Sequence, residues 1–457
     1  MNIYLHVEIS ARELDSKLLL ATIAASRGHQ VIVSDLTGII KGVQSGLLAP
    51  GIFHTKSLTP SEDKFARHKS LINKGFMITS IDEEGNLNDY GYHGFAKQRY
   101  SDEMIDQSSA VFGWGSEDVE ALKQIYTKNS NKIHKTGSPR ADLWKTLFSD
   151  YWNVPFSIPK KPFLLVACNT GYANNIKTFK ELIKFESQIG RFQRDPELLK
   201  KRIGETAEDY NKIFSYIKAV QYLSNHNNGF DIVLRPHPSE DIETWDILLK
   251  GIPNVHVIRD GPINVWVKNS FAVMHNSCTT ALEATVSKKP VVTYIPFEQQ
   301  YASKLANELG HRVESLEELS NKVNNIFVSH KLHNQKELDT PLPKIVSKKI
   351  HFDANELAAE KMIKIWENIA SDKLSKASNL KSFKWLFTYY KLKRITAKLL
   401  KRLSSAKINS TNKNSKFPEL NQYEINEKIK KFQHILGINK KIECKLLTKK
   451  TIHIKCL

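Results

Sequence analysis

The stretch Arg235-Pro236-His237-Pro238-Ser239 directly follows the apolar run 230–234, and a second polar stretch, Asn276-Ser277-Cys278-Thr279-Thr280-Ala281-Leu282-Glu283-Ala284, follows the apolar run 271–274. At both places a β-like run gives way to a helical pattern. In an open α/β sheet such places lie at the carboxyl edge of the strands, where ligands bind. The two stretches therefore predict a parallel sheet with a polar site at its edge.

The side chains in these stretches suit a nucleotide. The first stretch offers a guanidinium, an imidazole and a hydroxyl, and the second offers hydroxyls and backbone N–H groups at a helix start, where anions bind. A carboxylate one turn later could accept ribose hydroxyls. We predict donor-site roles for Arg235, His237, Ser239, Asn276, Ser277, Thr279, Thr280 and Glu283, with Asn169 and Gly171 in a further polar loop.

Structural explanations of the same residues stay open. A His-Pro pair is common in turns, a helix start needs a capping hydroxyl, and Glu283 could be a solvated helix carboxylate. Capping requires only one hydroxyl, however, and the second stretch has three. If His237 meets this hydroxyl cluster across the sheet edge, the two sides can hold one phosphate. Donors aimed at the leaving phosphate would then supply much of the rate.

Composition limits the class of protein. The 457 residues are 41% hydrophobic and 25% charged, which is typical of soluble globular proteins and enough for two or three domains. The N-terminus lacks a basic region followed by an apolar one, so we expect no signal peptide. No apolar run reaches the length of about 20 residues that a membrane-spanning helix needs. Four scattered cysteines without metal-ligand spacing favour a cytoplasmic protein with structural thiols.

The net charge of +19 is concentrated at the C-terminal end. From Ser371 onward the chain has 22 Lys and Arg against 5 Asp and Glu, so the preceding residues are nearly neutral. A neutral body argues against nucleic-acid binding, whereas a polybasic tail favours an anionic surface. Residues 383–403 combine helical spacing of apolar residues with many Lys and Arg, which is typical of a helix lying in a membrane interface. The alternative is a helix packed on the protein body.

Apolar runs and helical patterns alternate along most of the chain, which predicts parallel sheets covered on both faces. A proline-containing stretch at 148–161 divides the alternation in two, and the second half includes one long helical stretch at 175–224. We therefore expect two doubly wound, Rossmann-like domains facing across a cleft, the GT-B architecture of glycosyltransferases. The predicted parts are an acceptor-side domain at 1–150, a nucleotide-sugar domain at 160–345, a closing helix at 346–372 and a polybasic tail at 373–457.

Two charged segments at strand ends of the first domain are candidates for the cleft. The acids Asp82, Glu83 and Glu84 follow the apolar run 76–81, and one of them could remove the proton of an acceptor hydroxyl. The segment 8–15 contains Glu8 and Arg12, and Arg12 could bind a carboxylate or phosphate with two hydrogen bonds. A solvated loop at 82–84 and an internal Arg12–Glu8 pair are the structural alternatives.

The ARELDSKLLLA helix (11–21), the IDEEG segment (81–85), the GWGSEDVE turn (113–120) and the TGSPRADL segment (136–143) resemble bacterial surface carbohydrate biosynthesis proteins over residues 1–370. The acidic segment, the His-Pro motif and the hydroxyl-rich helix start are together similar to bacterial sialyltransferases and β-Kdo transferases. These are GT-B enzymes that use CMP-activated sugars. TGSPRADL, which includes Arg140, and the His-Pro motif also resemble CDP-glycerol glycerophosphotransferases.

This resemblance implies residue roles. Asp82 or Glu83 matches the acid that supplies the base, His237 matches the histidine on the CMP phosphate, and Ser277 with Thr279 matches the hydroxyls on that phosphate. The acidic segment here has three carboxylates, which leaves the choice of base open. We also place Arg140 with Glu8 and Arg12 among the residues that bind a substrate anion.

We expect a glycosyltransferase of bacterial surface polysaccharide biosynthesis that uses a cytidine-activated sugar without a metal or other cofactor. Its partners would be a nucleotide-sugar donor, a glycan or lipid-linked acceptor and the inner face of the cytoplasmic membrane, but not nucleic acid. The alternatives are a CDP-glycerol-type glycerophosphotransferase, a sugar-nucleotide 2-epimerase and a non-catalytic scaffold for polysaccharide assembly.

Overall fold

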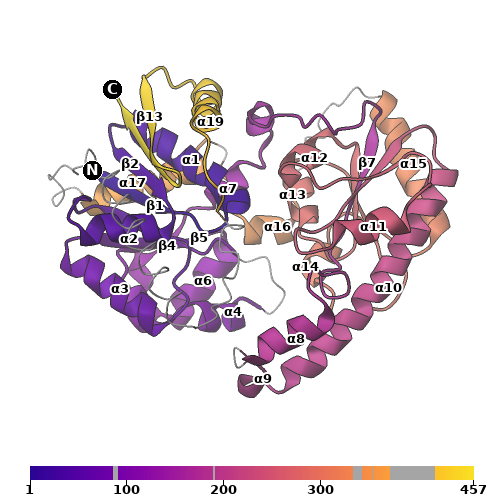
Figure 1. Ribbon diagram of the computed structural model, residues 1–457, viewed down its shortest axis with the longest axis horizontal. Helices are drawn as coiled ribbons and strands as arrows, with labels where there is room; N and C mark the ends of the chain where they lie inside the picture. The colour runs from indigo at the N-terminus through magenta and orange to yellow at the C-terminus, as the bar shows by residue number, and fades with distance from the viewer. Residues whose placement is uncertain (86–90, 189–190, 333–341, 354, 371–416) are drawn as a thin grey trace, which may run out of the picture. The chain divides into compact units, whose positions relative to one another are not determined.

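A computed structural model describes residues 1–85, 91–188, 191–332, 342–353, 355–370 and 417–457 (Figure 1). The chain forms two compact units. Unit 1 comprises Met1–Leu143 and Lys344–Leu457, and unit 2 comprises Trp144–Pro343. The sequence-based division had instead separated a closing helix and a tail from residue 346 onward, whereas the structure returns the described part of this region to unit 1.

Unit 1 contains six parallel strands in the order β2-β1-β3-β4-β5-β6. Their bounds are β1 Asn2–His6, β2 Gln30–Ser34, β3 Ile52–Thr55, β4 Met77–Ile81, β5 Ala110–Gly113 and β6 Ile133–Lys135. The chain runs from β1 outward to β2 and then crosses back to β3, so the direction of winding changes between β1 and β3. In doubly wound sheets ligands bind at such a switch point.

Helices and 3₁₀ turns connect these strands. They are α1 Ser10–Ser26, α2 Leu36–Gln44, α3 Glu62–Asn73, α4 Gly91–Arg99, α5 Asp102–Asp106, α6 Ser116–Ile125, η1 Thr127–Lys132 and α7 Pro139–Asp142, followed after unit 2 by α16 Lys344–Lys349 and α17 Ala358–Ala370. The returning helix α17 is anchored in the core of unit 1, because the fully buried Trp366 donates its indole N–H to Thr79 Oγ1 of β4 at 3.1 Å.

The end of the chain completes the unit 1 sheet. Helix α19 (Gln422–Ile435) packs on α1, and the strands β13 (Ile442–Thr448) and β14 (Thr451–Cys456) form an antiparallel hairpin. Strand β14 pairs antiparallel with β2, beside it in Figure 1. An unpaired edge strand invites association with other chains, and the hairpin covers the β2 edge. These 41 residues are therefore part of the domain rather than a separate tail.

Unit 2 contains a second parallel sheet in the order β9-β8-β7-β10-β11-β12. Its strands are β7 Phe163–Ala167, β8 Asp231–Arg235, β9 Val255–Val257, β10 Ala272–His275, β11 Val291–Tyr294 and β12 His311–Val313. The winding direction changes between β7 and β10, which is the strand order of dinucleotide-binding domains. The prediction of two doubly wound α/β domains is confirmed, and a cleft between them stays a prediction.

The connecting segments of unit 2 are η2 Thr146–Tyr151, α8 Phe179–Gln188, α9 Arg191–Arg194, α10 Glu197–Asn225, α11 Ile242–Leu248, α12 Ile263–Asn269, α13 Thr280–Val286, α14 Lys304–Asn307 and α15 Leu316–Leu332. The helical stretch predicted over 175–224 is interrupted, because α9 ends at Arg194 and α10 begins at Glu197. Pro196 stands at the start of α10, where the missing N–H and the ring end any helix arriving from before it.

The predicted interfacial helix at 383–403 lies outside the described residues, and its role stays a prediction. Within the part of the chain that the structure describes, no helix combines the length and apolarity needed to cross a bilayer.

Candidate functional site

The switch point of unit 2 brings two of the predicted segments together. Asn169 follows β7 and Ser277 follows β10, and these two strands are hydrogen-bonded neighbours. The Asn169 side-chain amide donates to the Ser277 carbonyl at 3.0 Å. This contact joins the predicted polar loop to the hydroxyl-rich stretch at the place where a doubly wound sheet binds its ligand.

The hydroxyl-rich stretch has a fixed and unusual backbone. Ser277 adopts φ of +60°, a conformation that non-glycine residues adopt at a cost. Asn307 of α14 holds this turn from both sides: its Oδ1 accepts from the Ser277 N–H at 2.7 Å, and its Nδ2 donates to Ser277 Oγ at 3.2 Å. Asn276 donates to the Tyr294 carbonyl at the end of β11. Sequence reasoning missed Asn307, which is 30 residues away from Ser277 along the chain.

The hydroxyls of this stretch differ in accessibility. Thr280 is buried, and the Cys278 thiol donates to its Oγ1 at 3.3 Å, whereas Thr279 is exposed. Burial also raises the pKa of Cys278, which keeps the thiol protonated. Of the two threonines, Thr279 is the one with an accessible side chain, whereas Thr280 is held within the turn.

The His-Pro motif presents one nitrogen of its imidazole. His237 Nδ1 lies 2.7 Å from Ser239 Oγ and accepts the Ser239 backbone N–H at 3.2 Å. With Nδ1 acting as an acceptor, the neutral ring carries its proton on Nε2. Partial desolvation, together with the charge of Arg259, lowers the pKa of His237, so the ring is neutral near pH 7 although the residue is exposed. The motif is thus a neutral hydrogen-bond donor at the end of β8.

Two further predicted residues order the loops around the site. Arg235 is buried and donates to the carbonyls of Asp260 and Gly261. Its guanidinium carbon lies over the Trp266 ring, 5.4 Å from the ring centroid. Its guanidinium therefore shapes the loop after β9, while burial lowers its pKa to about 10. At Gly171 a Cβ atom would lie 2.7 Å from Ser239 Oγ, so the absence of a side chain lets the loops after β7 and β8 approach closely.

Glu283, one turn into α13, is buried and oriented. Its Oε2 accepts from the Asn264 side-chain amide at 3.0 Å. Asn264 belongs to α12, which follows the loop that Arg235 fixes. The solvated carboxylate that the sequence left open is therefore not what the structure shows. In the sequence, the available signal for Asn264 is a side-chain amide near the start of the helical segment between β9 and β10.

The acidic segment of unit 1 is tied into ion pairs. Asp82 is buried and accepts two hydrogen bonds from the Arg99 guanidinium, at 2.8 and 2.9 Å. Glu83 is buried and pairs with Lys17 at 2.5 Å. The Glu84 side chain is 46% exposed and lies 3.1 Å from Arg99. The solvated-loop alternative therefore applies only to Glu84 among the three acids.

The remaining predicted residues of unit 1 lie in the same network. Arg140 donates to the Glu83 carbonyl at 3.1 Å. Arg12 pairs with Glu13 at 2.9 Å and approaches Glu84 at 3.8 Å. The alternative Arg12–Glu8 pair is not formed, because Glu8 pairs with Lys56 after β3.

Sequence reasoning missed Lys17, Arg99 and Lys56. A lysine on the apolar face of the predicted first helix was the one available signal for Lys17, since a buried lysine needs a partner. Nothing comparable marked Arg99 or Lys56.

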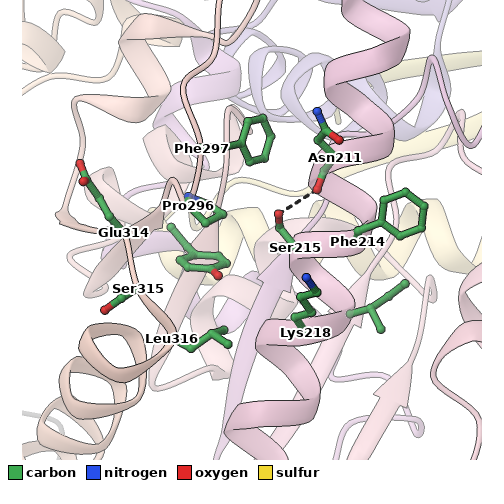
Figure 2. A pocket seen from close by; sticks show the side chains of 11 residues that line it. Asn211, Phe214, Ser215, Lys218, Pro296, Phe297, Glu314, Ser315 and Leu316 are labelled. Carbon is green, nitrogen blue, oxygen red and sulfur yellow. Dashed lines mark hydrogen bonds between the residues drawn. The ribbon is translucent and has the colours of Figure 1, made fainter.

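A cavity of about 860 Å³ lies beside the unit 2 site. Figure 2 shows Phe214 and Lys218 of α10 on one side and Pro296 and Phe297 on the other. Tyr294 also lines it, and the same residue accepts the Asn276 amide at the site itself. The cavity has the volume of a small-molecule pocket. Tyr294 is the residue that the cavity lining shares with the site at the sheet edge.

No protein-family model and no curated protein sequence matches the chain. Solved structures of similar fold include a putative UDP-N-acetylglucosamine 2-epimerase from Listeria monocytogenes, with 12% identity over 81% of this chain and 96% of that chain and a TM-score of 0.48. A glycosyltransferase from Rickettsia africae has 13% identity over 81% and 98%, with a TM-score of 0.43. The wall teichoic acid polymerase TagF has 10% identity over 70% and 73%, with a TM-score of 0.40. These similarities concern the fold.

Proposed function

We propose that the chain is a glycosyltransferase that takes its sugar from a nucleotide donor, which unit 2 binds at the carboxyl edge of its sheet. The observation that carries the proposal is that His237 and the turn at 276–280 follow the carboxyl ends of β8 and β10, the two strands that flank β7. One side presents a neutral N–H donor, and the other presents a hydroxyl on a turn that Asn307 holds in place. Both are groups that bind phosphate oxygens.

The spacing of the strands agrees with a phosphate ligand. Strands β8 and β10 both pair with β7, and neighbouring strands are about 4.8 Å apart, so the ends of β8 and β10 are about 10 Å apart. His237 and Thr279 therefore do not need to touch each other. Side chains reaching inward from both ends would leave room for a phosphate group between them.

Glu283 would bind the ribose in this arrangement. Its carboxylate is already oriented by Asn264, so it would lose little freedom on binding. A carboxylate accepts hydrogen bonds from both hydroxyls of a ribose. The phosphate-binding and ribose-binding groups then come from the end of β8 and from the turn and helix after β10.

The base that deprotonates the acceptor is proposed to be one of the acids 82–84. Glu84 is favoured by its exposure, since a base must reach the acceptor hydroxyl. Asp82 and Glu83 are buried in ion pairs and would hold Arg99 and Lys17 in place. The proposed reaction uses no metal ion, and the donors named above would stabilise the charge of the leaving phosphate by hydrogen bonds.

The cytidine base, the CMP-linked sugar and a role in bacterial surface polysaccharide assembly belong to the same proposal, and they rest on the sequence resemblance alone. The test is thermal unfolding of the full chain with CMP, CDP, UMP, UDP and GDP in turn, because a ligand that binds only the folded state raises the unfolding temperature. A shift with CMP supports an activated-sugar donor, and a shift with CDP alone moves the proposal to glycerophosphate transfer. A shift with UDP alone favours the 2-epimerase alternative, and no shift with any nucleotide contradicts the proposal.

A matched pair of variants separates catalysis from binding. Glu84→Gln should abolish transfer and leave the nucleotide-dependent temperature shift unchanged, because the proposed base does not bind the nucleotide. Glu62→Gln, an exposed acid at the start of α3, is the control and should change neither. Nucleotide binding without turnover of any donor in the unmodified chain would instead favour the scaffold alternative.

A further inference from the structure

The switch point of unit 1, between β1 and β3, is surrounded by cations. Lys56 follows β3, and Lys64 and Arg67 lie on the first two turns of α3, which continues from the same strand. Lys64 donates to the Ser57 carbonyl and hydroxyl at 3.3 and 3.1 Å, which brings its ammonium group back to the end of β3. Three positive side chains thus gather where the two halves of the sheet diverge.

Two of these cations lack a carboxylate partner. Lys56 pairs with Glu8. Within the described residues, neither Lys64 nor Arg67 has a carboxylate within ion-pair distance. The Arg67 Nε is moreover buried without a hydrogen-bond acceptor. A buried guanidinium nitrogen without an acceptor destabilises the fold. A bound anion would supply the missing acceptor.

The acids nearby are already engaged or only weakly coupled to the cluster. The negative charge of Asp82 raises the pKa of Lys64, but Asp82 is itself hydrogen-bonded by Arg99. The charge of Asp63 raises the pKa of Arg67 without the two side chains forming an ion pair. Burial, followed by the like charges of Arg67, Lys56 and Arg99, lowers the pKa of Lys64 to about 8. The cations therefore repel one another more than the acids compensate.

Two buried histidines border the same place. His6 is the last residue of β1 and stacks on Phe53, with 6.4 Å between the ring centroids. His68 of α3 lies edge-on to the same Phe53 ring, with 6.3 Å between the centroids. Within the described chain, both nitrogens of His68 and Nδ1 of His6 are buried without a hydrogen-bond partner. The cluster therefore contains further polar atoms that the protein itself leaves unsatisfied.

We propose that Lys64 and Arg67, with Lys56 at the end of β3, form a binding site for a phosphate group in unit 1, separate from the nucleotide site of unit 2. Two unpaired cations match the charge of a phosphate dianion, and the guanidinium can bind two of its oxygens. The phosphate can belong to a soluble phosphomonoester or to the headgroup of a lipid. Either source would place a phosphorylated substrate at the switch point of unit 1.

The test uses the nucleophilicity of Lys64 as a local reporter in the full chain. Amines are acetylated briefly with an N-hydroxysuccinimide ester near pH 7.5, and peptides are quantified by mass spectrometry. Inorganic phosphate, with chloride at equal ionic strength as the reference, should reduce acetylation of Lys64 and leave Lys69 unchanged. Lys69 is an exposed lysine on the same helix and serves as the internal control.

Variants show whether the protection comes from the proposed site. Arg67→Gln should raise the phosphate concentration needed for protection about tenfold or more, as expected for the loss of a charge-assisted hydrogen bond, and Arg67→Lys should restore part of it. His237→Ala should leave protection of Lys64 unchanged, which keeps this test independent of the nucleotide site. Vesicles containing phosphatidic acid are a separate arm, and protection by the vesicles alone assigns the site to a lipid headgroup. Failure of both phosphate and vesicles to protect Lys64, or equal protection in Arg67→Gln, would overturn the proposal.

Discussion

The buried ion pair between Lys17 and Glu83 allows a quantitative prediction for the acidic segment. The two side chains are 1% and 3% exposed, and their charged atoms are 2.5 Å apart. Replacing Lys17 by Met removes one charge and leaves the other buried without compensation. Breaking a pair of this kind costs about 3–5 kcal/mol. We therefore expect Lys17→Met to destabilise the region that joins α1 to the end of β4.

Hydrogen exchange of the β1 and β4 amides measures this effect locally, without requiring the two units to unfold together. A loss of about 3 kcal/mol corresponds to about 150-fold faster exchange. The double variant Lys17→Met/Glu83→Gln should recover most of the protection, because it removes both charges. Lys69→Met is the control for an exposed lysine. Exchange in Lys17→Met that stays within a few-fold of the unmodified protein would refute the view that Glu83 is a structural acid.

Two further predictions concern stability. Burial lowers the pKa of both His6 and His68 to about 3, so each side chain is neutral in the folded protein. The unfolded chain, by contrast, takes up protons at these residues below about pH 6.5. The free energy of unfolding should therefore decrease as the pH is lowered from about 6.5 toward 3, by up to about 1.4 kcal/mol per pH unit for each residue. Urea unfolding at several pH values should show a smaller slope in His68→Phe, and an unchanged slope would contradict this. Ile454 of β14 is fully buried, so Ile454→Ala should lower the free energy of unfolding in urea by about 2–5 kcal/mol. The neighbouring variant Lys455→Ala should change it little. Equally small effects of both variants would show that the hairpin does not contribute to the domain.

The doubly wound class was predictable because its signals are local. The run 163–167 is continuously apolar, as expected for a strand buried on both faces, and it forms β7 over the same residues. Strand β3 is shorter and carries His54, a buried polar residue, so its pattern did not stand out from its surroundings. Periodicity detects long apolar runs and misses short mixed ones.

The pairing of the C-terminal hairpin could not be predicted from local pattern. Its two β-like runs are visible in the sequence, but the partner of β14 is β2, and the contact between Ser34 and Thr451 spans 417 residues. Nothing in a short window specifies such a partner. For the same reason the sequence did not indicate that residues 417–457 belong to unit 1.

The candidate site was predictable at strand ends but not in its supporting residues. His237 and Ser277 follow apolar runs directly, so topology alone places them at a sheet edge. Asn307 binds Ser277, Asn264 binds Glu283 and Arg99 binds Asp82, each from another element of the fold. None of these three supporting residues has a motif of its own. Arg235 has a structural contact that its motif did not indicate, since its guanidinium donates to the carbonyls of Asp260 and Gly261. Its role in ligand binding stays a prediction.

The most direct test of the central claim is calorimetric titration of the full chain with CMP, comparing the unmodified protein with His237→Ala. Loss of a hydrogen bond to a charged phosphate costs about 1.5–3 kcal/mol, so the dissociation constant should rise about tenfold to 150-fold. His311→Ala, an exposed histidine on β12 of the same unit, should leave it unchanged. Equal affinity of His237→Ala and the unmodified protein for CMP would contradict the assignment of the nucleotide site.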